Sequence, residues 1–298
     1  MDYAIQQMVN ALSFGAEYAL LALGLAIVFS VMGLVNFAHG DVIAVGGYTM
    51  VAFAAIVTAN PWIVILGAIV AAALTSVLLE RVAFRPVRYA DPTTGLLTAF
   101  GVSIVLQNLF LLFVSPRPIA VTSLYFMDVP IEMFGVQVSS LQLLESVTTV
   151  LVIVGLTLFL NRSVWGLAMR AASLDFEMVR LMGIRANRVF ALAFLISGLL
   201  AGLACIFIMA RRGSVDPHLG FNPVLKAFVA CVVGGFGSLP GAVLGGFLLG
   251  AVEVGMLVLL PQEYGGMKDA FVFGIIALIL VWRPNGILSP AVEKGDKL

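Results

Sequence analysis

Residues 12–35 read LSFGAEYALLALGLAIVFSVMGLV, and this long apolar run decides the fold class. Glu17 is the one charged residue in it. A helix needs about 20 apolar residues to cross a bilayer, because the hydrocarbon core is about 30 Å thick and each residue rises about 1.5 Å. The run meets this length, so we expect a membrane-spanning helix.

Apolar runs of similar length follow along the rest of the chain. A shorter one, residues 225–236, cannot cross alone, and GSLPG at residues 237–241 separates it from the next run. Such a Gly/Pro break is typical of broken or re-entrant helices, which occur where protein or a water-filled path covers the backbone. The expected full spans are residues 12–35, 42–59, 62–84, 94–114, 141–160, 190–210, 241–260 and 269–283.

These runs predict an all-α fold: a polytopic membrane helical bundle of about eight full spans, with a broken or re-entrant segment near residues 225–240. We expect a single domain over residues 1–298. The composition agrees, because only 11% of the residues are charged, against roughly 25% in an average soluble domain, and the mean hydropathy is +1.11. With 16 basic and 16 acidic residues, the chain has no basic stripe for nucleic acid, which excludes that partner.

The distribution of Lys and Arg predicts the orientation. If residues 161–189 are cytoplasmic, most of the lysines and arginines fall on the cytoplasmic side, as membrane proteins generally require. We therefore expect a multi-pass membrane protein in contact with lipid, with its C-terminus in the cytoplasm and its N-terminus on the opposite side of the membrane.

Residues 161–189, NRSVWGLAMRAASLDFEMVRLMGIRANRV, form the longest segment between spans on that side and are rich in helix formers. An apolar face would collect Ala168, Ala172, Phe176, Val179 and Gly183 within about 80° of one another, and Gly183 would end the helix. Two interpretations stay open for this amphipathic helix. It could lie in the lipid headgroup layer, or it could dock into a groove of a cytoplasmic partner.

Part of this segment, GLAMRAASLDFEMVRLMGI, resembles the coupling loop of ABC importer permeases. Ala171 and Ala172 match the alanine pair of that loop and Gly183 its later glycine, while Asp175 matches an acid common in the branched-chain amino acid branch. The resemblance implies that this segment contacts an ATPase. The candidate coupling residues are Arg170, Ala171, Ala172, Asp175, Phe176, Val179 and Gly183.

Three further stretches resemble the LivH-type permease of branched-chain amino acid ABC importers. They are YALLALGLAIVFSVMGLVNFAHGD at residues 18–41, KAFVACVVGGFGSLPGAVLGG at residues 226–246 and RPNGIL at residues 283–288. The resemblance implies a permease that moves branched-chain, possibly other, amino acids from periplasm to cytoplasm by alternating access. It also implies a second homologous permease as a heterodimer partner, two cytoplasmic ABC ATPases and a periplasmic solute-binding protein. The same resemblance implies a location in the bacterial cytoplasmic (inner) membrane, with the N-terminus in the periplasm.

The sequence contains no recognisable motif for nucleotide binding, metal binding or catalysis. The phosphate-binding motif G-x-x-x-x-G-K-[ST] does not occur, so ATP and Mg²⁺ should be bound by the partner ATPases, and we expect no cofactor in this chain. Only His39 and His218 could begin a metal site, and they are far apart in sequence with no cysteine nearby, so we expect no metal. We assign no catalytic residue, which predicts a transport subunit and not an enzyme.

Polar residues at two breaks are candidates for the substrate pathway or its gate. A charged side chain does not face lipid at depth, so the polar turn NFAHGD either caps the following helix or lines a gate; both interpretations stay open. Gly33–Gly40 and Gly234–Gly241 share a seven-residue spacing, a possible trace of an internal repeat. The candidates at the two breaks are Asn36, His39, Gly40, Asp41, Gly234, Gly235, Gly237 and Pro240.

Glu253 is a further candidate, because it lies within an expected span. It could contact the second permease or line the pathway, and both roles stay open. Two alternative functions also remain. One is a permease of the same family for urea or short-chain amides, and the other is a proton-coupled secondary transporter that uses acids such as Glu17, Asp41 and Glu253.

Overall fold

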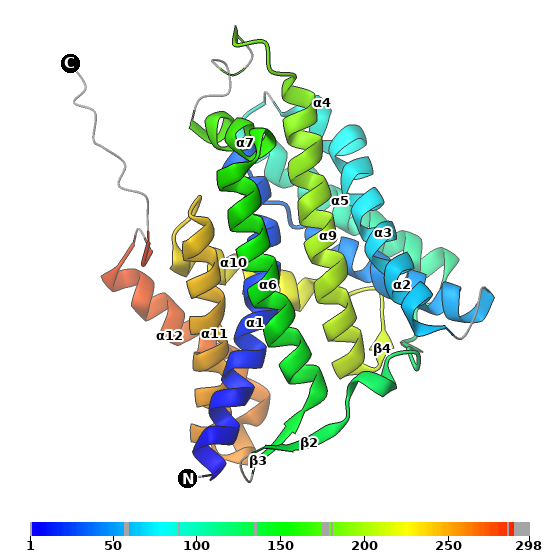
Figure 1. Cartoon of the computed structure of the whole chain (residues 1–298), viewed down its shortest axis with the longest axis vertical. Helices are drawn as coiled ribbons and strands as arrows, with labels where there is room; N and C mark the ends of the chain where they lie inside the picture. Colours follow the sequence, from blue (N-terminus) through cyan, green and yellow to red (C-terminus); the bar gives the residue numbers. More distant parts are fainter. Residues whose placement is uncertain are drawn as a thin grey trace.

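Long apolar helices make up most of the chain (Figure 1). The structure is a computed structural model that describes residues 2–56, 60–88, 90–133, 136–174, 179, 181–284 and 286–288. Its α-helices are α1 (Asp2–Met32), α2 (His39–Ile56), α3 (Pro61–Leu79), α4 (Arg85–Val87), α5 (Pro92–Phe113), α6 (Ser140–Arg162), α7 (Val164–Leu174), α9 (Ala186–Arg212), α10 (Phe221–Gly234), α11 (Leu239–Leu259) and α12 (Lys268–Trp282).

Short elements connect these helices. A π-helical turn, η1 (Glu80–Phe84), joins α3 to α4, and 3₁₀ turns occur at η2 (Tyr125–Met127) and η3 (Gln262–Met267). Within the described part of the chain, four short strands form two antiparallel pairs. They are β1 (Ile119–Ala120) with β4 (Ser214–Val215), and β2 (Pro130–Met133) with β3 (Val136–Ser139).

Eight helical segments within the described residues are long and apolar enough to cross a membrane, which confirms the expected fold class. The ninth apolar segment, α10, has only 14 residues and is the short segment that the sequence predicted. The eight segments are Tyr3–Met32, His39–Ile56, Pro61–Val87, Thr93–Phe113, Ser140–Arg162, Asn187–Arg212, Leu239–Leu259 and Glu263–Trp282.

The first helix is the centre of the bundle. α1 is largely buried among α6, α9, α10 and α11, whereas α5, α6 and α12 expose long apolar faces. Small residues allow α1 and α11 to pack backbone against backbone: a Cβ added at Gly250 would lie 2.3 Å from the backbone nitrogen of Gly15. Such close contact between small residues is the usual packing of helices within a membrane, where water supplies no driving force between them.

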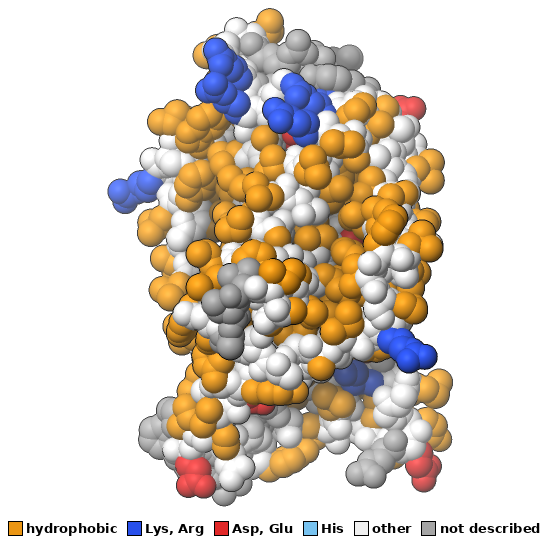
Figure 2. All heavy atoms as spheres, turned by 90° about the vertical axis from the view of Figure 1, so that its right-hand side faces the viewer, with side chains coloured by type: hydrophobic (Ala, Val, Ile, Leu, Met, Phe, Trp, Pro, Cys, Tyr) orange, Lys and Arg blue, Asp and Glu red, His pale blue; other side chains and the backbone are white. Residues whose placement is uncertain are grey.

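The two ends of the bundle differ. Figure 1 shows the N-terminus and the strands β2, β3 and β4 at one end, with α7 at the other. On the face seen in Figure 2, hydrophobic side chains cover the middle of the molecule and most charged side chains lie near its ends. This distribution suits a hydrocarbon layer around the middle, because charged groups are costly there.

Local sequence explains where several helices begin and end. Ser139 and Gln142 form a capping box at the start of α6, and Asn60 accepts a hydrogen bond from the backbone nitrogen of Trp62 at the start of α3. Gly213 ends α9 with φ of +68°, a left-handed conformation that glycine adopts without steric cost. The chain then turns into β4.

Candidate functional site

The helix α7 folds sharply back from the end of α6. The Ser163 hydroxyl accepts a hydrogen bond from the backbone nitrogen of Gly166, at 2.9 Å. Gly166 packs directly on the preceding helix, since a Cβ there would lie 2.4 Å from Cα of Leu160. One face of α7 is buried, including Ala168 and Ala172, while the opposite side is exposed. The segment is therefore a two-faced helix at one end of the bundle.

A groove of about 950 Å³ runs beside α7 and the chain that follows it; we call it the coupling groove. Its walls are mainly apolar, and Arg185 and Arg188 contribute the charged groups among its lining residues. Gly183, one of the lining residues, has φ of +79°. The other lining residues are Val164, Trp165, Leu167, Ala168, Ala171, Leu174, Val179, Met182 and Ile184.

The structure brings three of the candidate coupling residues together in this groove: Ala171, Val179 and Gly183. Ala172 is buried on the inner face of α7, and Arg170 donates a hydrogen bond from Nη1 to Oδ1 of Asn161, at 3.0 Å. Asp175 and Phe176, the remaining two candidates, lie outside the described residues.

The break between α10 and α11 lies beside α7. A second groove of about 360 Å³ is lined by Met169 and Arg170 of α7 and by Gly237, Ser238 and Pro240 of the break. The coupling segment and this candidate gate segment, separated by about 50 residues in sequence, therefore share one end of the bundle.

Glycines define the geometry of this break. Gly235 and Gly237 have φ of +108° and +84°. The two helices approach so closely that a Cβ at Gly234 would lie 1.9 Å from the carbonyl oxygen of Gly241. Ser238 caps α11 by accepting a hydrogen bond from the backbone nitrogen of Gly241.

The RPNGIL stretch closes the same break. The backbone nitrogens of Ile287 and Leu288 donate to the carbonyl oxygens of Val233 and Gly234, at 2.8 and 2.9 Å. Helix ends leave carbonyl groups without partners, and here a distant part of the chain supplies the donors. Two of the motifs that carry the resemblance are thus in direct contact.

The polar stretch NFAHGD leads from α1 into the first turn of α2, and its polar side chains are buried. Asn36 is buried, and His39 is buried with Nδ1 at 3.1 Å from the Ser197 hydroxyl. Oδ1 of Asp41 accepts a hydrogen bond from Nε2 of Gln107, at 3.0 Å, which ties α2 to α5. Asp41 also lies in the first turn of α2, where the helix dipole favours a negative charge.

Aromatic rings connect the two breaks. The ring of Phe37, in the NFAHGD turn, lies 5.3 Å from that of Phe228 in α10, centroid to centroid. Phe228 in turn lies 5.6 Å from Phe236 in the α10–α11 break. Gly40, at the start of α2, packs against Gly220 at the start of α10. The two candidate gate segments are therefore parts of one packed region.

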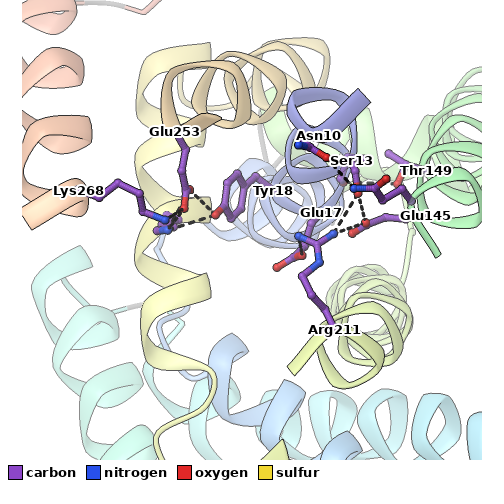
Figure 3. Close-up of polar contacts among 12 residues, drawn as sticks. Asn10, Ser13, Glu17, Tyr18, Glu145, Thr149, Arg211, Glu253 and Lys268 are labelled. Atoms are coloured by element: carbon purple, nitrogen blue, oxygen red, sulfur yellow. Dashed lines mark hydrogen bonds and ion pairs between the residues drawn. The ribbon is translucent and has the colours of Figure 1, made fainter. Parts of the chain in front are cut away.

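Glu253 lies inside the bundle in a cluster of polar side chains from four helices, with the charged groups on α10, α11 and α12 (Figure 3). Its Oε1 lies 2.9 Å from Nζ of Lys226 and 2.6 Å from Nζ of Lys268, and its Oε2 accepts a hydrogen bond from the Tyr18 hydroxyl at 2.5 Å. A buried carboxylate requires partners of this kind, because an unpaired charge in the interior is strongly unfavourable.

A second cluster on the other side of α1 was not expected from the sequence (Figure 3). Arg211 of α9 lies between two carboxylates, 3.1 Å from Glu17 of α1 and 2.5 Å from Glu145 of α6, and Ser13 donates a hydrogen bond to Glu145. An acid within a span needs a cation nearby, so Glu17 was a signal that such a cluster exists. Nothing local in the sequence identifies its partners.

Residues 7–281 match a family model described as the permease component of the branched-chain amino acid transport system. The chain belongs to this permease family. The family resemblance inferred from the four motifs is thereby confirmed, and the permease is a transport subunit of an ABC system and not an enzyme. Such a permease works with ATPase and binding-protein partners in general.

Relatives cover nearly the whole permease. It is 40% identical to BraD, a high-affinity branched-chain amino acid transport permease of Pseudomonas aeruginosa, over 97% of each chain. It is 37% identical to the corresponding LivH permease of Escherichia coli, over 98% of each. Among solved structures, the fold resembles an inward-facing ABC transporter assigned to the metal-chelate type, with a TM-score of 0.51, 17% identity and coverage of 93% of this chain and 85% of that one.

Proposed function

We propose that this permease imports branched-chain amino acids across the cytoplasmic membrane, driven by ATP hydrolysis in partner subunits. The observation that carries the proposal is the position of α7, a two-faced helix beside the α10–α11 break and beside a large apolar groove. Family membership supports the transport system, and the names of the relatives support the substrate class.

The coupling groove suits an ATPase better than a lipid headgroup layer. Its apolar walls, with Trp165, Ala171 and Val179, could receive the apolar ridge of a partner, while Arg185 and Arg188 could fix its orientation. A helix that only lies on the membrane presents its apolar face to lipid. In α7 the face with Ala168 and Ala172 is already buried against the permease itself.

A movement of α7 could be transmitted directly to the substrate pathway. Because α7 shares the second groove with Gly237 and Pro240, a shift of α7 would displace the α10–α11 break. The same break connects through Phe228 to Phe37 in the NFAHGD turn. We propose that these two segments form the gate on the cytoplasmic side of the pathway, reaching from the α7 end into the bundle, and that rocking of the bundle gives alternating access.

The orientation and the assembly belong to the same proposal. With the α7 end in the cytoplasm, the arginines of residues 161–189 would lie on the cytoplasmic side, as the positive-inside rule requires. Arg88, which bonds to Asn187, would lie on the same side. The whole chain would act as one transmembrane domain, paired with a second, homologous permease. Two ATPases would bind at the α7 end and a periplasmic binding protein at the end that carries β2 and β3.

Reconstitution of the complete complex in proteoliposomes tests the proposal. Leucine uptake should require ATP, the ATPases and the binding protein. Ala171→Trp should place a bulky side chain in the coupling groove, obstruct docking there and abolish both co-purification of the ATPases and uptake. Leu151→Trp, on the exposed face of α6, should change neither. Uptake that continues without the ATPases, or uptake of urea in place of leucine, would refute the proposal.

A further inference from the structure

A chain of hydrogen bonds leads from the buried start of α2 to an exposed histidine. Nε2 of Gln107 donates to Oδ1 of Asp41 and to the Ser103 hydroxyl, each at 3.0 Å. Oε1 of Gln107 lies 3.0 Å from Nδ1 of His218. The backbone nitrogen of His218 in turn donates to Oδ1 of Asp216, which fixes the loop that carries it. We call Asp41, Gln107 and His218 the polar relay.

The direction of each hydrogen bond in the polar relay follows from chemistry. An ionised Asp41 can only accept, so Gln107 must turn its NH₂ group toward it. The Gln107 oxygen is then left to accept, and the donor must be the Nδ1–H of His218. In the neutral ring, Nε2 of His218 is therefore the acceptor. Because His218 is exposed, the relay directs an acceptor toward the outside of the chain.

The region around His218 lies within the bundle and not at its end. Gly220 packs on Gly40 at the starts of α10 and α2, and Lys226 in the second turn of α10 contacts Tyr18, near the middle of α1. Figure 1 shows α10 beginning partway along the bundle. Irregular backbone at such depth requires cover by protein or water. His218 and Asn222 are exposed here, so this face should meet a water-filled path or a partner subunit and not lipid.

Aromatic residues lie on the same side of α5 as Gln107, two helical turns away, about 10 Å at 1.5 Å of rise per residue. Phe100 lies seven residues before Gln107, on the same face of α5, and its ring stacks on Phe37 with centroids 4.6 Å apart. Phe37 also contacts Phe228, as described above. One face of α5 therefore carries Gln107, which orients the acceptor, and, two turns away, the exposed Phe100 stacked on the half-buried Phe37. This combination matches an α-amino acid that has an apolar side chain.

We propose that Nε2 of His218 accepts a hydrogen bond from the α-ammonium group of an apolar amino acid on the transport pathway, with the substrate side chain against Phe100 and Phe37. Gln107 and Asp41 act through His218 as positioning residues. This subsite rests on the proposed function, because it assumes that an amino acid passes along this face.

Two readouts from the reconstituted complex separate the subsite from a structural role. His218→Ala and Gln107→Leu should lower leucine transported per ATP hydrolysed by about tenfold, the effect of losing one hydrogen bond to a charged group. ATP hydrolysis stimulated by the leucine-loaded binding protein should remain. The matched control is Asn108→Leu, which removes an amide from the same helix that bonds only to the carbonyl of Ile104 among the described residues. Unchanged transport per ATP in the first two variants would overturn the subsite.

Labelling of the wild-type complex keeps the subsite testable if these variants fail to assemble. A diazirine analogue of leucine, activated by light during ATP-driven turnover, should label residues 100–108 or 218–228. Labelling only of other segments, or none while uptake proceeds, would overturn the subsite but leave the import function intact. A wild-type complex that cannot take up leucine at all would instead refute the proposed function.

Discussion

Arg211 shows how single charges determine the stability of this bundle. Its guanidinium lies between Glu17 and Glu145 and also over the ring of Phe14, 4.3 Å from the centroid. The side chain thus joins α9 to α1 and α6. Removing a cation from such a cluster leaves two acids facing each other with little water to screen them.

We expect Arg211→Met to destabilise the permease by about 3–5 kcal/mol, the typical cost of breaking a buried ion pair. The measurement is the thermal unfolding midpoint in detergent. Its neighbour Arg212 is the matched control, because Arg212 is half exposed and pairs with Asp216, which directly follows β4. Arg212→Met should shift the midpoint little, since exposed ion pairs contribute little to stability. Equal shifts in the two variants would show that the Arg211 cluster is not a stabilising contact.

At the level of elements, the contact between α2 and α10 depends on glycine. A Cβ at Gly220 would lie 1.8 Å from the carbonyl oxygen of Gly40, and backbone atoms on that side cannot move away as a flexible side chain can. The contact holds two helix starts together inside the bundle. It also positions Asp41 and His218 on either side of Gln107.

Gly220→Ala should therefore separate the two helices and cost about 1–3 kcal/mol, as overpacking does in other cores. Gly101→Ala in α5 is the control, because nothing lies within 4 Å of a Cβ at that position. That substitution should be neutral or should stabilise the helix by up to about 1 kcal/mol. Unfolding in detergent measures both, and a neutral Gly220→Ala would contradict the close contact.

The membrane spans were predictable because each one is a long apolar run that can be recognised from its own residues. The apolar run of residues 12–35 and the GSLPG break needed no knowledge of the rest of the chain. Contacts between helices were not predictable in this way. Glu145 and Arg211 are 66 residues apart, and nothing in either neighbourhood indicates the other. The strands β1 and β4 pair over only two residues each, which is too short for a strand pattern in the sequence.

For the candidate site, the sequence located the functional segments but did not identify which side chains contact one another. Gly183 and the α10–α11 break were found from glycine and proline positions, which have local backbone causes. Glu253 was singled out as a buried acid, but its pairing with Lys226 and Lys268 depends on how four helices meet. The polar relay was missed for the same reason, since Asp41, Gln107 and His218 come from three separate parts of the chain.

At the scale of the whole molecule, the two ends of the bundle should be on opposite sides of the membrane. Ser173 is an exposed residue of α7, and Thr122 is exposed near β1 at the other end. The native cysteines, Cys205 and Cys231, are buried and should not interfere with thiol labelling.

We expect a membrane-impermeant maleimide to label Thr122→Cys in intact cells. Ser173→Cys should be labelled only after the inner membrane is made permeable. Both variants should retain leucine uptake, which serves as the control for folding. The reverse pattern would place α7 outside the cell and would contradict the proposed docking of the ATPases.

The contact of Ile287 and Leu288 with the end of α10 has a practical consequence for handling the protein. A truncation before Arg283 would remove the hydrogen-bond donors of two backbone carbonyls beside the α10–α11 break. It would thereby loosen the segment that we propose the ATPases displace through α7. Expression designs should therefore keep the chain through Leu288 and attach purification tags only beyond a flexible spacer. A fused tag that displaces Ile287 and Leu288 would itself inhibit transport.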